Sequence, residues 1–145
     1  MGLINLRLLC GLLLLILSAA AAAADFKVTD TRLRLLPGDL PAAGYFKLSN
    51  ISGGPVSLVG AESPAFGHIT MHKSIQDNGV ARMEPVPRLE VAPGTSVEFS
   101  PGGYHLMLMK RQSPIDLGDE VTVTLVFADG QRFPIIFEAV SPASL

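Results

Sequence analysis

Cysteine is nearly absent from the sequence: Cys10 is the only one among 145 residues, and there is no tryptophan. Charged residues are also scarce, at 17%, and they nearly cancel to a formal net charge of −2. Such a balance gives no support for nucleic-acid binding, which requires a basic face. The chain also lacks the G-x-S-x-G turn of serine hydrolases and the G-x-x-x-x-G-K-[ST] phosphate loop, so we do not expect an enzyme.

The first 24 residues have the layout of a secretory signal peptide: Arg7, an apolar run over residues 8–18, and alanines over 19–24. The run is shorter than the roughly 20 apolar residues that span a bilayer. We therefore predict export to the periplasm, cleavage after Ala24 and no stable membrane insertion afterwards. A retained amino-terminal anchor is the alternative, because the alanines can extend the apolar stretch.

Cys10 precedes most of the apolar run and follows Leu9, where a lipoprotein site requires a small residue, so we do not expect lipidation there. Cleavage would leave residues 25–145, without cysteine and with a net charge of −3, since Arg7 is the only charged residue removed. Neither disulfides nor thiolates can then take part in the mature protein. Its length predicts one domain, and we expect a monomer.

After residue 24 the sequence consists of short β-like segments separated by turn signals, with no convincing helical periodicity. The signals include Ser52-Gly53-Gly54-Pro55, Asp77-Asn78-Gly79 and Asp129-Gly130. The pattern predicts an all-β fold, a Greek-key sandwich or barrel. The predicted strands are 28–35, 45–49, 56–61, 68–74, 80–85, 88–91, 95–99, 104–109, 121–127 and 133–139.

Histidine and methionine concentrate in two segments, the first with His72 and Met83 and the second with His105, Met107 and Met109. In the second, strand alternation places His105, Met107 and Met109 on one face and apolar neighbours on the other. In the first, Asp77-Asn78-Gly79 lies midway between His72 and Met83, so a hairpin there brings these two side chains opposite or diagonal to each other. The sequence does not decide between a two-residue and a four-residue loop.

Two imidazoles with two thioethers suit a soft monovalent ion, copper(I), better than zinc, calcium or magnesium. A blue-copper electron-transfer site would need a cysteine thiolate, and the mature chain has none. This absence favours metal carriage over redox work. Taken singly, however, a strand methionine is more commonly a core residue than a ligand. The residues alone therefore leave a metal-free protein open.

The remaining histidine and methionines have other expected roles. His68 shares the face of His72 but lies about 13 Å along the strand, so we interpret it as a rim residue. Met71 points to the opposite face and is expected in the core. Core packing is also the expected role of Met109, with support of the metal site as the alternative.

The spacing of His72, Met83, His105 and Met107 resembles the metal-binding signature of the periplasmic copper chaperone family called PCu(A)C. Three further segments of the sequence resemble this family: Gly44-Tyr45-Phe46, Val91-Ala92-Pro93-Gly94 and Pro101-Gly102-Gly103-Tyr104-His105-Leu106-Met107. The resemblance covers residues 31 to 139. It implies a cupredoxin-like Greek-key fold with one copper(I) ion held by those four side chains.

The resemblance also implies partners: delivery of copper to the dinuclear copper (CuA) centre of cytochrome c oxidase, alone or with a thioredoxin-like assembly protein. Two departures are visible. Lys73 stands where the family usually has an acidic residue, and no His- and Met-rich segment follows Ser141, so the copper(II) site of some members is not expected. A metal-free β-sandwich interaction module and a copper-dependent redox enzyme remain the rival interpretations.

Overall fold

The computed structural model describes residues 25–145. The predicted signal peptide, its cleavage site and Cys10 lie outside the described residues. In the part that is described, no helix is long and apolar enough to cross a membrane.

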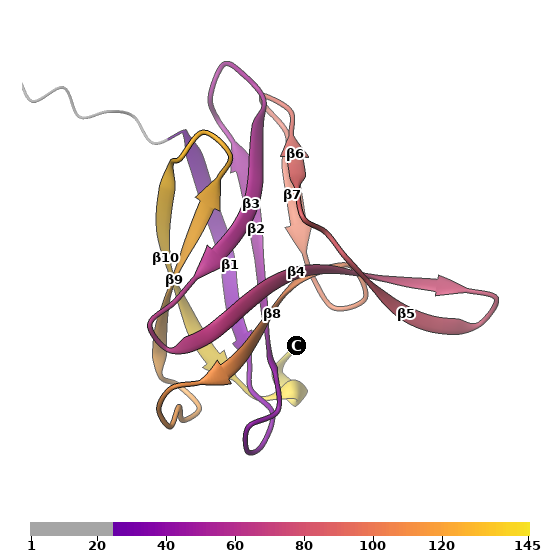
Figure 1. Cartoon of the computed structure of the whole chain (residues 1–145), viewed down its shortest axis with the longest axis vertical. Coiled ribbons are helices and arrows are strands. Elements are labelled where there is room, and N and C mark those ends of the chain that lie inside the picture. The colour runs from indigo at the N-terminus through magenta and orange to yellow at the C-terminus, as the bar shows by residue number, and fades with distance from the viewer. Residues whose placement is uncertain (1–24) are drawn as a thin grey trace, which may run out of the picture.

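Ten strands make up the described chain, followed by a single 3-10 turn, η1 (Pro142–Ser144) (Figure 1). The predicted all-β class is confirmed, and every predicted strand has an observed counterpart. The strands are β1 (Phe26–Arg34), β2 (Ala42–Asn50), β3 (Val56–Glu62), β4 (Phe66–Asp77), β5 (Val80–Pro85), β6 (Leu89–Val91), β7 (Ser96–Phe99), β8 (Tyr104–Arg111), β9 (Glu120–Phe127) and β10 (Arg132–Val140).

The strands are hydrogen-bonded in the order β5-β4-β8-β7-β2-β1-β10-β9-β3-β6, and β8 also pairs with β2. Most pairs are antiparallel, but β1 with β10 and β7 with β8 are parallel. β3 and β4 are far apart in this order and still contact each other, so the sheet folds back on itself around a core. The predicted sandwich or barrel is therefore found.

Phenylalanines fill the centre of this sandwich. The ring of Phe46 stacks on Phe99 with centroids 4.3 Å apart and meets the edge of Phe137 at 5.9 Å. Phe26 stacks on Phe127 at 3.9 Å. These rings come from β1, β2, β7, β9 and β10, so the aromatic core ties together strands that are distant in the sequence.

Several strands are longer than predicted because they pair with more than one neighbour. β2 begins at Ala42, since Ala42 to Gly44 pair with β8 before the rest of the strand pairs with β7. β4 extends to Asp77 because its second half leaves β8 and pairs with β5. The pairing of β2 with β8 is long-range and has no signal in the local sequence.

The β4–β5 hairpin projects from the body of the sandwich (Figure 1). Asp77 pairs with Val80, and the two residues between them, Asn78 and Gly79, have φ angles of 50° and 79°. Two consecutive positive φ angles are typical of the tight two-residue turn of a β-hairpin. The loop therefore has two residues, a length that the sequence left open. Every residue of the projecting strand β5 is exposed.

Candidate metal centre

The two predicted ligand segments lie side by side, because β4 pairs with β8. His72 is directly opposite His105, and Thr70 is directly opposite Met107. Met71 and Leu106, the residues between them, are buried in the core. His72, His105 and Met107 therefore share the outer face of this strand pair, as strand alternation requires.

The two imidazole rings are close enough to bind one ion. Their centroids are 5.7 Å apart with an angle of 44° between the ring planes, and a metal lies about 2 Å from a coordinating imidazole nitrogen. His105 Nδ1 lies 3.3 Å from the carbonyl oxygen of Gly103. When Nδ1 donates this hydrogen bond, the lone pair on Nε2 is free for a metal.

Burial keeps His105 neutral, because only 8% of the residue is exposed. Loss of hydration is the main cause that lowers the pKa of His105, and the electrostatic influence of the neighbouring His72 and Arg34 side chains lowers it further. The hydrogen bond to Gly103 opposes this shift. A lowered pKa leaves the imidazole unprotonated near neutral pH, which is the form that binds a metal.

The Nδ1 atom of His72 is buried and has no hydrogen-bond partner among the described residues. A buried polar atom without a partner is unfavourable and calls for an explanation. Binding of an ion by this nitrogen in the loaded protein is one such explanation.

Met83 occupies a different position from the other three candidates. It pairs with Ser74 in the projecting hairpin and is diagonal to His72, one of the two arrangements predicted. Met107 is diagonal to His72 on the other side, so the histidine stands between the two methionines. Met83 is 59% exposed, which makes it the most accessible of the four.

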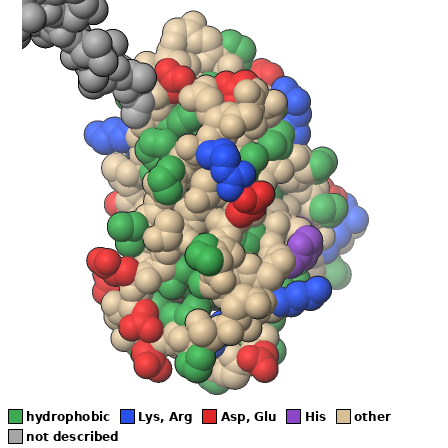
Figure 2. All heavy atoms as spheres, turned by 60° about the vertical axis from the view of Figure 1, so that its left-hand side comes forward, with side chains coloured by type: hydrophobic (Ala, Val, Ile, Leu, Met, Phe, Trp, Pro, Cys, Tyr) green, Lys and Arg blue, Asp and Glu red, His purple; other side chains and the backbone are tan. Residues whose placement is uncertain are grey.

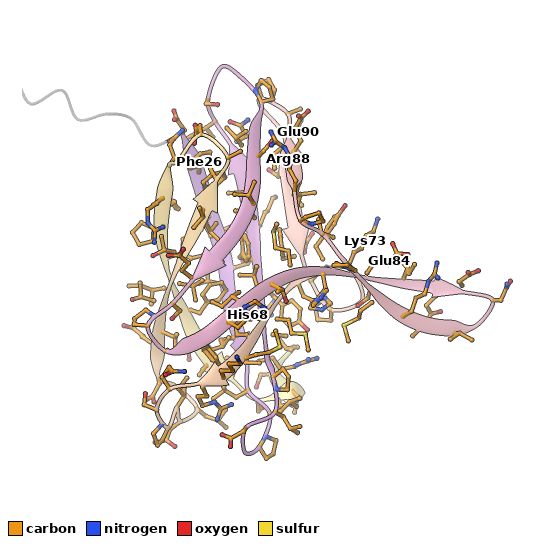
Figure 3. The ribbon with its side chains drawn as sticks, viewed as in Figure 1. Phe26, His68, Lys73, Glu84, Arg88 and Glu90 are labelled. Atoms are coloured by element: carbon orange, nitrogen blue, oxygen red, sulfur yellow. The ribbon has the colours of Figure 1, made fainter. Side chains whose placement is uncertain are left out.

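Two cations flank the site. The Lys73 side chain lies on the opposite face of β4 from His72, with its ammonium 5.2 Å from the ring centroid of Tyr104 and with Glu84 opposite it (Figure 3). Arg34 has no predicted role, but its guanidinium lies 5.9 Å over the Tyr45 ring, near His105. In the sequence, the alternation Arg32-Leu33-Arg34-Leu35 indicates a polar face there and gives no sign of a metal site.

The three remaining predictions have different outcomes. Met71 is buried in the core as predicted. His68 is exposed, as expected of a rim residue. The core role expected of Met109 is wrong: the residue is half-buried outside the core cluster, because it shares the outer face with Met107. Within residues 25–145, no group of three or more His, Cys, Asp and Glu side chains could hold a metal ion.

A family model described as "Putative lipoprotein LpqE-like" matches residues 26–138. The chain belongs to this family. A putative lipoprotein of Leifsonia xyli subsp. xyli is 31% identical over 94 residues, which are 64% of this chain and 57% of that protein. A protein of Rickettsia prowazekii is 35% identical over 92 residues, 63% of this chain and 51% of that one. The chain thus matches little more than half the length of these curated relatives.

Solved structures resemble this LpqE-like chain over most of its length. The copper-bound PCuAC domain of PmoF2 aligns with a TM-score of 0.69 and 24% identity, covering 83% of this chain and 97% of that domain. The copper(I) form of DR1885 from Deinococcus radiodurans aligns with a TM-score of 0.66 and 29% identity, covering 86% and 84%. The resemblance to PCu(A)C domains and the cupredoxin-like Greek-key fold that it implies are confirmed.

Proposed function

We propose that this protein is a copper chaperone, and not an enzyme, which carries one copper(I) ion on His72, Met83, His105 and Met107. The observation that carries this proposal is the direct pairing of His72 with His105, with Met107 on the same outer face. The PmoF2 domain is copper-bound and shares the fold, and the similarity to the copper(I) form of DR1885, at 29% identity, supports the same cargo here.

The chemistry of the donor set fits copper(I). Polarizable thioethers prefer soft ions, and residues 25–145 contain no cysteine to favour zinc or an iron–sulfur cluster. All four donors are neutral, so the loaded site keeps a single positive charge. The nearby guanidinium of Arg34 adds a second reason why copper(I) is favoured over the more highly charged copper(II).

Release would proceed by stepwise ligand exchange, beginning at the most exposed donor, Met83. The hairpin face that carries Met83 has no formal charge; its other members are His72, Ser74, Gln76, Ala81 and Pro85. The charged side chains lie on the opposite face, where Arg82 contacts Glu84 at 3.3 Å and Asp77 at 3.9 Å. An incoming thioether or imidazole could therefore approach Met83 without meeting a charge.

We further propose that the chaperone works in the periplasm, and that its recipient is the CuA centre of cytochrome c oxidase, reached alone or with a thioredoxin-like assembly protein. The signal-like sequence over residues 1–24 and membership of a family described as putative lipoproteins support export. The recipient rests on the family resemblance.

The test is an anaerobic copper(I) titration of the purified protein against a chromophoric chelator, with His72→Ala and Met107→Ala beside it. We expect one tight equivalent, weakened at least tenfold, or about 1.4 kcal/mol, in each variant. Met71→Leu is the matched control, because Met71 neighbours His72 but faces the core. Circular dichroism would show that each variant is folded.

Two results would contradict the proposal. Wild-type protein that fails to compete with the chelator would favour a metal-free interaction module. Copper-dependent oxygen consumption with cycling of the metal would favour a redox enzyme. Once tight binding is found, the proposed recipient is tested by measuring copper transfer from the loaded protein to a soluble CuA domain.

A further inference from the structure

A further pair of soft donors continues the ladder between β4 and β8. His68 is directly opposite Met109, one step beyond the Thr70–Met107 pair and two steps beyond the His72–His105 pair. The register between the strands is continuous from His72 to His68. The proposed function assigns no role to this pair.

Burial shows that His68 and Met109 project on the same side as the proposed site. Ile69 and Leu108, their neighbours toward the site, pack in or against the core. Since side chains alternate along a strand, His68 and Met109 point outward. Side chains directly opposite each other have Cβ atoms about 4.5–5.5 Å apart, so an imidazole and a thioether here can converge on one ion.

The pair is too far from the first site to supply it with a fifth ligand. Two steps of two residues along a strand correspond to about 13 Å. Met107 lies in between, roughly 7 Å from the rung on either side. An ion at His68 and Met109 would therefore be a separate ion, with Met107 as the intermediate donor.

The surroundings of His68 leave room for an external ligand. A hollow of about 300 Å³ adjoins it, lined by residues 61–63 and 66–69. Its one carboxylate, on Glu62, is paired with Arg132. Figure 3 shows His68 on the body of the sandwich, away from the hairpin that carries Lys73 and Glu84. An ion here would be accessible at the end of the β4–β8 pair that lies away from Met83.

We propose that His68 and Met109 form a second, weaker copper(I) site, which exchanges ions with the tight site through the thioether of Met107. The inference rests on the proposed function, because the same soft cargo would occupy both. Two donors from the chain are sufficient for a soft d¹⁰ cation but fewer than the four of the first site, so binding is weaker and exchange faster.

The test uses silver(I), a diamagnetic soft cation, and copper(I) under anaerobic conditions. With ¹³C-methyl-labelled methionines, the first silver equivalent should shift the Met83 and Met107 methyl signals, and the second should shift Met109. The Met71 methyl is the internal control, since Met71 faces the core. Copper(I) titration should give a second equivalent at least tenfold weaker than the first.

Substitutions separate this inference from the proposed function. His68→Ala and Met109→Leu should each abolish the second equivalent and keep the first within about twofold. His72→Ala should weaken the first and leave the Met109 shift with silver. Wild-type protein that binds one equivalent only, or variants that still bind two, would overturn the second site and leave the chaperone intact. Wild-type protein that lacks the first, tight equivalent would instead contradict the proposed function. If silver also leaves the Met109 methyl signal of that protein unmoved, the second site is overturned as well.

Discussion

Two histidines that look equivalent in the sequence have different surroundings in the fold. His105 is buried and has a backbone partner, the carbonyl group of Gly103. His72 is partly exposed, and its buried Nδ1 has no partner within the described residues. His105 therefore has a polar partner within the chain, whereas under the proposed function the metal would supply the partner of His72.

Acid should release the copper. A proton competes with the ion for each imidazole, so we expect copper(I) affinity to fall between about pH 7.5 and about pH 5. Because the pKa of His105 is lowered, its contribution to this loss begins below about pH 6.5, the ordinary histidine value. Chelator competition at several pH values measures this, and a constant affinity would contradict it.

The stability of the metal-free protein should follow the same group. His105 binds a proton less readily in the folded chain than in the unfolded chain. Its contribution to the free energy of unfolding is therefore complete above about pH 6.5 and is lost as the pH falls through the lower folded value. Urea unfolding with His105→Gln as the control should show a smaller pH dependence in the variant.

Met83 and Met107 should make unequal contributions to copper retention. Met83→Leu should raise the rate of copper transfer to a chelator at least tenfold and leave the melting temperature unchanged, because the side chain is exposed. Met107→Leu should lower the equilibrium affinity more strongly, because Met107 is half-buried beside the histidine pair. Stopped-flow transfer and equilibrium competition separate the two, and equal effects would argue against Met83 as the exchange point.

At the scale of elements, the β4–β5 hairpin determines where Met83 lies. Its turn geometry sets the register, and a slip by one residue would turn Met83 to the charged face. Gly79 has a φ of 79° with open space around it, so its glycine is required by conformation and not by packing.

Gly79→Ala should therefore strain the turn by about 1–2 kcal/mol. Gly53→Ala is the matched control, because a Cβ added at Gly53 also meets nothing within 4 Å and the φ of Gly53 is not in the strained range. We expect faster hydrogen exchange of the hairpin amides and weaker copper binding in the first variant only. Similar behaviour of both variants would show that the turn does not control the site.

The described part of the molecule is a β-sandwich from which one hairpin, β4–β5, projects (Figure 1). The aromatic core lies away from the hairpin, and the outer surface in Figure 2 carries scattered hydrophobic side chains among charges of both signs. Stability and copper binding should therefore be separable.

Phe46→Ala should cost about 3–5 kcal/mol, because Phe46 is 1% exposed and packs against two other rings. Ile136→Ala, at an exposed position, should cost less than about 0.5 kcal/mol. Urea unfolding measures both. At urea concentrations below its lowered unfolding midpoint, the Phe46 variant should still bind copper at the tight site. Loss of copper binding under those conditions would show that the core and the site are coupled.

Export should leave Asp25 as the first residue. Asp25 accepts a hydrogen bond from the Ile51 backbone at 3.0 Å, directly before β1, so cleavage after Ala24 would leave the fold complete. Amino-terminal sequencing and intact mass of the protein from the periplasm test this. A retained anchor or a lipid on Cys10 would each give a distinct larger mass.

The sequence by itself determined the number and type of the strands, the place of a turn at Asp77-Asn78-Gly79 and the soft character of the donors. These are local properties: alternation, positive φ and side-chain chemistry act within a few residues. Spacing within one hairpin was also sufficient to bring Met83 near His72.

Only the tertiary structure decided that His72 lies opposite His105. The two belong to strands separated by β5, β6 and β7 in the chain, and their pairing depends on long-range burial of Met71, Leu106 and Leu108. The same register moved Met109 out of the expected core and placed it beside His68. A one-residue shift between β4 and β8 would have turned the donors of one strand inward, and no local signal excludes that shift.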